Sequence, residues 1–311
     1  MELRHLRYFL AVGEALNFTR AAARLRVAQP ALSRQIQDLE DEIGVDLLSR
    51  SPRGVTLTAE GKLFLEEVRE LLKHADESVE RVRALARGEF GELHIGYAPL
   101  PTTEILAPAL ARFQKAVPRV KVLLHDLSSD ELIAGLRNGT LELAIMVEPT
   151  GEQTADIEFE LLRTYPLCVA MTVAHPFARL KSITLEKLAT EPLVVLSRKD
   201  YPESYRFLDR LFAPISAKPQ IAVECDSASS LITEVEAGRG IALATSVFKL
   251  VAGKRLLYRP LTGTTEAASV GIARATKGDV TPAGERFCEL LRQLRIAARS
   301  PAVSKSATAG P

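Results

Sequence analysis

Basic and hydrogen-bonding side chains dominate two stretches near the N-terminus that contain no acid. The charged residues of positions 15–37 are Arg20, Arg24, Arg26 and Arg34, and those of positions 47–59 are Arg50 and Arg53. Guanidinium groups pair with phosphates, and arginine and glutamine side chains can read the edges of bases. This local excess of positive charge predicts a nucleic-acid contact, although the 311-residue chain has a net charge of only +1.

A second set of residues that could bind a ligand lies in the C-terminal part of the chain. Hydroxyl residues precede two expected helices, and further donors follow an expected strand: Thr102 and Thr103, Ser128 and Ser129, then Ser197, Arg198 and Lys199. Free amides at a helix N-terminus favour anions, so this pattern predicts a site for an organic anion. The alternative is that Thr103 and Ser129 only cap their helices.

Catalytic and metal-binding patterns are absent from the sequence. It contains no G-x-S-x-G, CxxC, HExxH or Walker motif, and the glycine pair at positions 238 and 240 lacks the third glycine of a dinucleotide-binding loop. The five histidines do not cluster at metal-ligand spacing. Three widely separated cysteines fit reduced, buried thiols. We therefore expect no catalytic residue, no metal and no cofactor.

The N-terminal basic residues fall on a predicted group of short helices. Apolar spacing indicates helices over positions 3–13, 21–26 and 29–43, with Asn17 or Thr19 as the cap of the second and Gly44 as the end of the third. Positions 47–58 read as strand, turn and strand, because a Pro and a Gly bracket the turn.

The third helix separates into an apolar face and a polar face. Leu32, Ile36, Leu39 and Ile43 share one side, while Pro30, Ser33, Arg34 and Gln37 share the other. A short helix, a tight turn and a second helix of this kind are typical of a helix-turn-helix, whose second helix enters the major groove. The alternative is an ordinary amphipathic helix with a solvated polar face.

A long helix is predicted from Thr58 to about Arg87. Its apolar stripe suits pairing with a second copy of the chain, and packing against its own chain is the alternative. A hinge is expected at positions 87–91. Beyond it, strand-like runs alternate with helical patterns up to about Ile296, which indicates two α/β lobes of mostly parallel sheet with a cleft between them.

The stretch "ALNFTRAAARLRVAQPALSRQIQDLEDEIGVDLLSRSPRGVTLTAEG" at positions 15–61 closely resembles the N-terminal domain of LysR-type regulators. The later stretches "LELAIM", "VAHPFA" and "EVEAGRGIAL" resemble the effector domain of the same family, which is similar to periplasmic solute-binding proteins. The opening "MELRHLRYF" resembles the branch that controls the breakdown of aromatic compounds. Glu148 departs from some aromatic-acid sensors of the family, which carry a basic residue there.

The resemblance implies an α+β multidomain protein. Its expected parts are a winged helix-turn-helix (1–58), a linker and dimerisation helix (59–88), an effector domain of two α/β lobes (89–297) and a disordered tail (298–311). The expected DNA contacts are Arg20, Gln29, Pro30, Ser33, Arg34, Gln37, Arg50 and Arg53. The expected effector contacts are Thr102, Thr103, Ser128, Ser129, Ser197 and Arg198.

The expected partners are double-stranded operator DNA, a small-molecule effector, further copies of the chain as dimers that pair into tetramers, and RNA polymerase. No apolar run is long enough to span a membrane, so a cytoplasmic protein is expected. Two alternatives stay open. One is a ligand-binding or enzymatic α/β protein whose N-terminal module serves protein contacts, and the other is an architectural DNA-binding protein without an effector.

Overall fold

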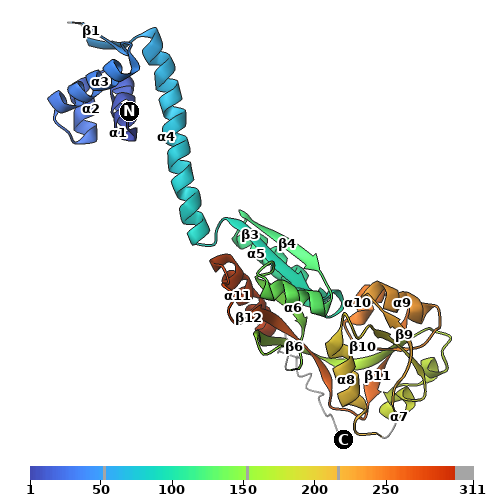
Figure 1. Ribbon diagram of the computed structural model, residues 1–311. Helices are drawn as coiled ribbons and strands as arrows, with labels where there is room; N and C mark the ends of the chain where they lie inside the picture. Colours follow the sequence, from blue (N-terminus) through green and yellow to red (C-terminus); the bar gives the residue numbers. More distant parts are fainter. Residues whose placement is uncertain (52–53, 152–153, 216–217, 298–311) are drawn as a thin grey trace, which may run out of the picture. The chain divides into compact units, whose positions relative to one another are not determined.

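A computed structural model describes residues 1–51, 54–151, 154–215 and 218–297, with the backbone alone at 99–101, 103 and 295–297. The chain divides into two compact units, Met1–Ala84 and a second unit that starts at Leu85 (Figure 1). The expected tail at 298–311 lies outside the described residues. Within the described part, no helix is long and apolar enough to cross a membrane.

The first unit contains three short helices, a hairpin and most of a long helix (Figure 1). These elements are α1 (Leu3–Ala15), α2 (Phe18–Leu25), α3 (Gln29–Ile43), β1 (Leu48–Ser51), β2 (Gly54–Leu57) and α4 (Ala59–Ala86). The side chain of Asn17 accepts a hydrogen bond from the Arg20 amide, so Asn17 is the cap of α2 and the helix starts earlier than the sequence suggests. The hairpin is antiparallel, with Leu48 opposite Leu57.

The apolar residues of α4 divide between two faces. Leu65, Val68 and Leu72 are buried in the core of the first unit together with residues of α1 and α3. Gly61 lets the helix pass close to the hairpin, because a Cβ there would lie 1.9 Å from the Leu47 carbonyl oxygen. Five further large apolar residues of α4 are exposed, and we call them the outer stripe: Leu63, Leu71, Val79, Val82 and Leu85.

The second unit consists of two lobes that share strands β6 (Ile157–Met171) and β12 (Ala267–Ala275). The first lobe is built from β3 (Gly91–Tyr97), α5 (Pro99–Ala116), β4 (Val120–Asp126), α6 (Ser129–Arg137), β5 (Leu143–Val147) and α11 (Pro282–Ala297). The second contains β7 (Ile183–Thr184), α7 (Leu185–Leu188), β8 (Pro192–Leu196), α8 (Pro202–Phe212), β9 (Gln220–Cys225), α9 (Ala228–Glu236), β10 (Ala242–Thr245), α10 (Phe248–Ala252) and β11 (Leu257–Thr262).

The shared strands complete the sheets of both lobes. The start of β6 pairs with the end of β12, which in turn pairs with β5, whereas the end of β6 pairs with β10 and β11. These central pairings are antiparallel, so the expectation of a mostly parallel sheet is correct for β3, β4 and β5 and wrong for the strands that cross between the lobes. A strand that leaves one lobe and a strand that returns to it run in opposite directions.

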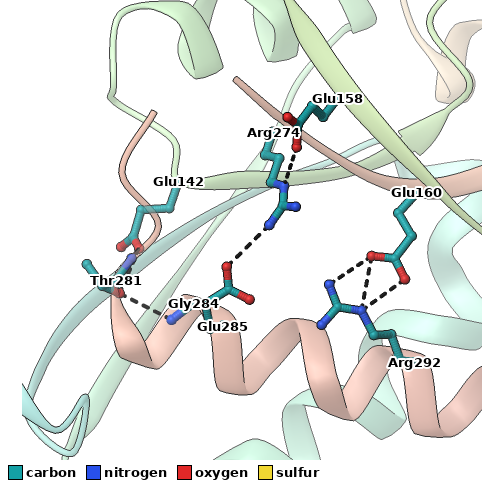
Figure 2. Close-up of polar contacts among 8 residues, drawn as sticks. All are labelled: Glu142, Glu158, Glu160, Arg274, Thr281, Gly284, Glu285 and Arg292. Atoms are coloured by element: carbon teal, nitrogen blue, oxygen red, sulfur yellow. Dashed lines mark hydrogen bonds and ion pairs between the residues drawn. The ribbon is translucent and has the colours of Figure 1, made fainter. Parts of the chain in front are cut away.

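The last helix, α11, returns to the first lobe as the sequence predicts. Phe287 and Leu291 are buried in the same core as Phe113, and the Phe113 and Phe287 rings meet edge to face at 5.3 Å. Figure 2 shows the polar contacts that accompany this packing: Arg292 pairs with Glu160, Arg274 with Glu158 and Glu285, and Glu142 with Thr281.

The turn between α4 and β3 lies against the start of α11. Gly88 adopts a φ of +66°, and a Cβ at this position would lie 2.4 Å from the backbone nitrogen of Ala283. The left-handed backbone and the close approach both require glycine here. The predicted hinge is therefore in contact with the first lobe through its glycine.

Candidate DNA-reading surface and ligand cavity

Helix α3 presents an exposed polar face, as its sequence pattern predicts. Leu32, Ile36 and Leu39 are fully buried on the other side. Gln29, Pro30, Arg34 and Gln37 are exposed and Ser33 is half-buried. No side chain caps the start of α3 within the described residues, so its first amides are available to an acceptor such as a phosphate.

The long side chains on this face are not engaged by the protein. Arg34, Gln37 and Arg20 have no side-chain hydrogen bond or ion pair within the described residues, and Arg20 is exposed on α2. Arg24, also on α2, differs because it pairs with Glu14 at 3.0 Å. Arginines that reach into solvent keep their guanidinium donors free for bases or phosphates.

Arg50 on the wing is held by contacts to the helices. Its guanidinium donates to Glu40 at 3.2 Å and to Ser33 at 3.4 Å, and it lies over the Phe18 ring at 5.2 Å. Its side chain remains about 40% exposed, so one face can still meet a phosphate. Arg53, the other expected wing contact, lies outside the described residues.

Glu40 is a positioning residue that the sequence analysis missed. Its carboxylate is buried and accepts hydrogen bonds from the Leu47 and Leu48 amides at 2.9 Å while it pairs with Arg50. It thereby joins the end of α3 to the wing. The sequence does contain a signal for this role. Glu40 is an acid next to Leu39 and one turn after Ile36, so it falls on the apolar side of the helix.

The hydroxyl residues expected at the effector site are occupied by the protein itself. Helix α5 begins at Pro99, so Thr102 and Thr103 lie inside the helix and do not precede it as expected. Proline is compatible with a first helical turn, which explains the earlier start. Thr102 is buried and donates to the Ala98 carbonyl, and the side chain of Thr103 lies outside the described residues.

Each of the three serines donates its hydroxyl to a nearby carboxylate. Ser128 caps α6 and donates to Glu131 at 2.8 Å, Ser197 donates to Asp200 at 2.6 Å, and Ser129 donates to Glu203 at 2.5 Å. The last bond joins the first lobe to the second. An ionised carboxylate is a stronger acceptor than a neutral group, so a ligand would compete with these acids for the hydroxyls.

The Arg198 side chain packs against an aromatic ring. Its guanidinium lies over the Tyr205 ring at 4.4 Å, and its backbone amide donates to Glu224. Sequence spacing placed the donors near one another but could not reveal the acids that receive them, because Glu131, Asp200, Glu203 and Glu224 reach them through turns and tertiary contacts.

A cavity of about 310 Å³ lies among β8, β10 and α8, with the end of β5 and part of β12 on its wall. Its wall is mainly apolar and includes Leu167, Val194, Leu196, Phe207, Leu243 and Phe248. The size and apolar lining are typical of a small-molecule site. Within the described residues, no group of three His, Cys, Asp or Glu side chains could hold a metal ion.

The polar side chains on the cavity wall differ from those expected. They include Glu148, Glu203 and Glu266, with Arg210 and Thr150, and none of the six predicted effector residues is among them. The Thr150 hydroxyl is buried and has no hydrogen-bond partner in the described part of the chain. Burial raises the pKa of the Glu203 carboxyl above its ordinary value, and the hydrogen bond from Ser129 opposes that rise.

Two family models match this chain, one within each of its two compact units. Residues 3–62 match the family described as "Bacterial regulatory helix-turn-helix protein, lysR family", and residues 86–295 match "LysR substrate binding domain". The HTH-type transcriptional regulator AlsR of Bacillus subtilis is 35% identical over 261 residues, which cover 84% of this chain and 86% of that protein.

Two further proteins extend the comparison over nearly the whole chain. The Hca operon transcriptional activator HcaR of Escherichia coli is 32% identical over 299 residues, 94% of this chain and 98% of that protein. The crystal structure of full-length CbnR complexed with its target DNA has a TM-score of 0.79 at 30% identity. It covers 95% of this chain and 100% of that one.

Proposed function

This chain belongs to the LysR family of DNA-binding transcriptional regulators, and on that premise we propose that its α3 helix reads an operator while a ligand in the β8–β10–α8 cavity regulates the reading. Membership of this family of regulators excludes the alternative of an enzyme. The substrate-binding effector domain excludes the alternative of an architectural DNA-binding protein without an effector.

The exposed Arg34 on α3, which has no side-chain partner within the described residues, is the observation that carries the DNA-reading role. We propose that Gln29, Pro30, Ser33, Arg34 and Gln37 meet base edges and that Arg20, Arg50 and Arg53 meet phosphates. Arginine binds guanine in a bidentate manner, which an exposed guanidinium on a groove-sized helix can achieve. CbnR, which is similar over nearly its whole length, is bound to its target DNA in the solved complex. We therefore propose that the protein acts in the cytoplasm, on chromosomal DNA.

The outer stripe of α4 supports the proposed pairing of two copies. Its members, Leu63, Leu71, Val79, Val82 and Leu85, are between 49% and 69% exposed, a large apolar surface for a single helix. Pairing through this stripe would present two α3 helices to two half-sites of an operator.

The Ser129–Glu203 bond supports the proposed regulation. Glu203 lines the cavity and also receives a hydrogen bond from the other lobe. A ligand that contacts Glu203 would therefore favour one arrangement of the lobes over another. Operator and ligand affinities would then depend on each other by the same factor in both directions.

The test compares Arg34→Ala with Arg24→Ala in the full-length protein, on an operator selected from a random DNA library. Both variants lose one arginine, but Arg24 pairs with Glu14 on α2. Arg34→Ala should lose about 1–3 kcal/mol of operator binding and relax base preference at one position. Arg24→Ala should retain the preference of the wild type. Equal behaviour of the two variants would remove α3 from its proposed role.

A further inference from the structure

The cavity is acidic as well as apolar. Three of its lining side chains are carboxylates, of which Glu203 is buried, Glu266 half-buried and Glu148 exposed. Arg210 is the only basic side chain on its wall within the described residues, and it lies over the Phe207 ring at 5.6 Å. No arginine or lysine lies within ion-pair distance of the three carboxylates in that part of the chain. The wall therefore carries an excess of negative charge.

Glu203 has fewer hydrogen bonds than a buried carboxylate can accept. An ionised carboxylate has about four acceptor positions. The side chain is 92% buried, and it receives the Ser129 hydroxyl and a bond from its own backbone amide. Arg206 is near enough to favour the charged form without a direct ion pair. A buried carboxylate with unused acceptor positions is stabilised by an added donor, most strongly by a charged one.

We propose that the ligand of this cavity is an organic ammonium, an apolar body with one positively charged amino group that binds Glu203. This inference rests on the proposed function and specifies the chemistry of its ligand. The apolar side chains Leu167, Val194, Leu243 and Phe248 surround the body of the ligand. The Thr150 hydroxyl, which has no partner among the described residues, is a further acceptor on the wall.

An organic anion, the ligand expected from the serine and threonine pattern, fits this wall poorly. It would meet the three carboxylates, whereas the hydroxyls of Ser128, Ser129 and Ser197 already donate to acids of the protein. Bringing like charges together in an apolar surrounding is unfavourable for both. Charge and hydrogen-bond supply both favour a donor ligand.

The ammonium group and the Ser129 hydroxyl would donate to the same carboxylate, and each donor reduces the negative charge available to the other. Ser129 belongs to the first lobe and Glu203 to the second, so a ligand bound to Glu203 weakens a bond between the lobes. Each of the two donors then weakens the other. Removing the serine hydroxyl should make the carboxylate more available to the ligand.

The experiment is calorimetric titration of the full-length protein with benzylamine, benzyl alcohol and benzoate, which share a ring and differ in charge. Benzylamine, protonated at neutral pH, should bind about tenfold more tightly than benzoate. Glu203→Gln should weaken benzylamine about tenfold and change benzyl alcohol little. Ser129→Ala should strengthen benzylamine binding about threefold. If the Ser129–Glu203 bond had only a structural role, Ser129→Ala and Glu203→Gln would both weaken benzylamine binding.

Two more variants locate the site and guard against misfolding. Ser204 is half-buried in the first turn of α8 and lines the cavity, so Ser204→Phe places a ring in the cavity and should abolish binding of all three probes. Glu148→Gln changes an exposed position and should weaken benzylamine about threefold even if Glu203→Gln fails to fold.

The outcomes separate the ligand class from the proposed function. Benzoate binding as tight as benzylamine, with loss in Ser204→Phe, would overturn the ammonium ligand and leave the cavity as an effector site. Failure of every probe at millimolar concentration would also overturn it. Benzylamine binding as expected, but without any effect on operator affinity, would instead overturn the proposed regulation.

Discussion

At the scale of single residues, Glu40 illustrates how a buried acid organises a basic surface. Its carboxylate holds two amides of the wing and the guanidinium of Arg50, so the wing is fixed relative to α3. Arg50 therefore has two possible roles. It stabilises the wing through Glu40, and it is exposed enough to contact a phosphate.

We predict that Glu40→Ala loosens the wing by about 3 kcal/mol, because two buried amides and one guanidinium lose their acceptor. Hydrogen exchange of residues 44–51 in the full-length protein should quicken about a hundredfold, which is the equivalent change in local opening. Arg50→Ala should quicken the same amides less and should also reduce the salt dependence of DNA binding. Unchanged exchange in Glu40→Ala would show that the wing is held by other contacts.

The three cysteines are buried thiols, as their sequence spacing predicts. Burial raises the pKa of Cys168 to about 12 and that of Cys288 to about 11, and it raises the pKa of Cys225 as well. Because the thiolate is the reactive form, a raised pKa keeps each thiol neutral at pH values below it.

We predict that Ellman's reagent labels none of the three thiols in the native protein near pH 8 and all three in guanidinium chloride. Absorbance of the released chromophore counts the reacted thiols. Rapid labelling of one native thiol would identify a cysteine that is accessible on the time scale of the reaction.

At the scale of elements, α4 shows what a periodic pattern can and cannot tell. The sequence predicted a long helix with one apolar stripe, and the structure divides that stripe between a core face and an outer face. Consecutive residues of a helix differ by about 100° of rotation. Leu71 and Leu72 are neighbours in sequence but are 50% and 6% exposed.

We predict opposite failures for two neighbouring substitutions in α4. Leu71→Asp should leave the first unit folded and convert the assembly to monomers, because it places a charge on the outer stripe. Leu72→Asp should unfold the first unit, because a buried leucine is replaced by an unpaired charge. Sedimentation velocity reports the assembly and circular dichroism the helix content. Dimers in Leu71→Asp would move the interface to another surface.

The sequence predicts long periodic elements well and their ends less well. Helix α5 starts at Pro99, before Thr102 and Thr103 and not after them as expected, because prolines that usually mark a break are tolerated in a first turn. The polar face of α3 could be predicted because all its residues belong to one helix. The cavity could not be predicted, because its wall comes from β5, β8, β10, β12 and α8, and their juxtaposition depends on how β6 and β12 cross.

At the scale of the whole molecule, the first lobe depends on the end of the chain. Its core joins Phe113 in α5 to Phe287 and Leu291 in α11, and the whole second lobe lies between these two helices in sequence. We predict that Phe287→Ala costs about 3–5 kcal/mol, because a fully buried ring leaves a cavity.

Trypsin cleavage of the full-length protein checks this prediction. The second unit should be digested faster in Phe287→Ala, whereas residues 1–84 should remain as resistant as in the wild type. Gln293→Ala, an exposed position on the same helix, is the matched control. Equal resistance of both variants would mean that α11 contributes little to the first lobe.

The return of α11 also fixes an order of events during synthesis. The first unit is continuous in sequence, so it can fold while the ribosome is still translating the rest, as N-terminal domains generally do. The first lobe has to wait until Phe287 has left the exit tunnel. A premature stop codon late in the gene would therefore yield subunits that can pair and occupy an operator but have no complete sensor, and such subunits would be dominant over the normal product.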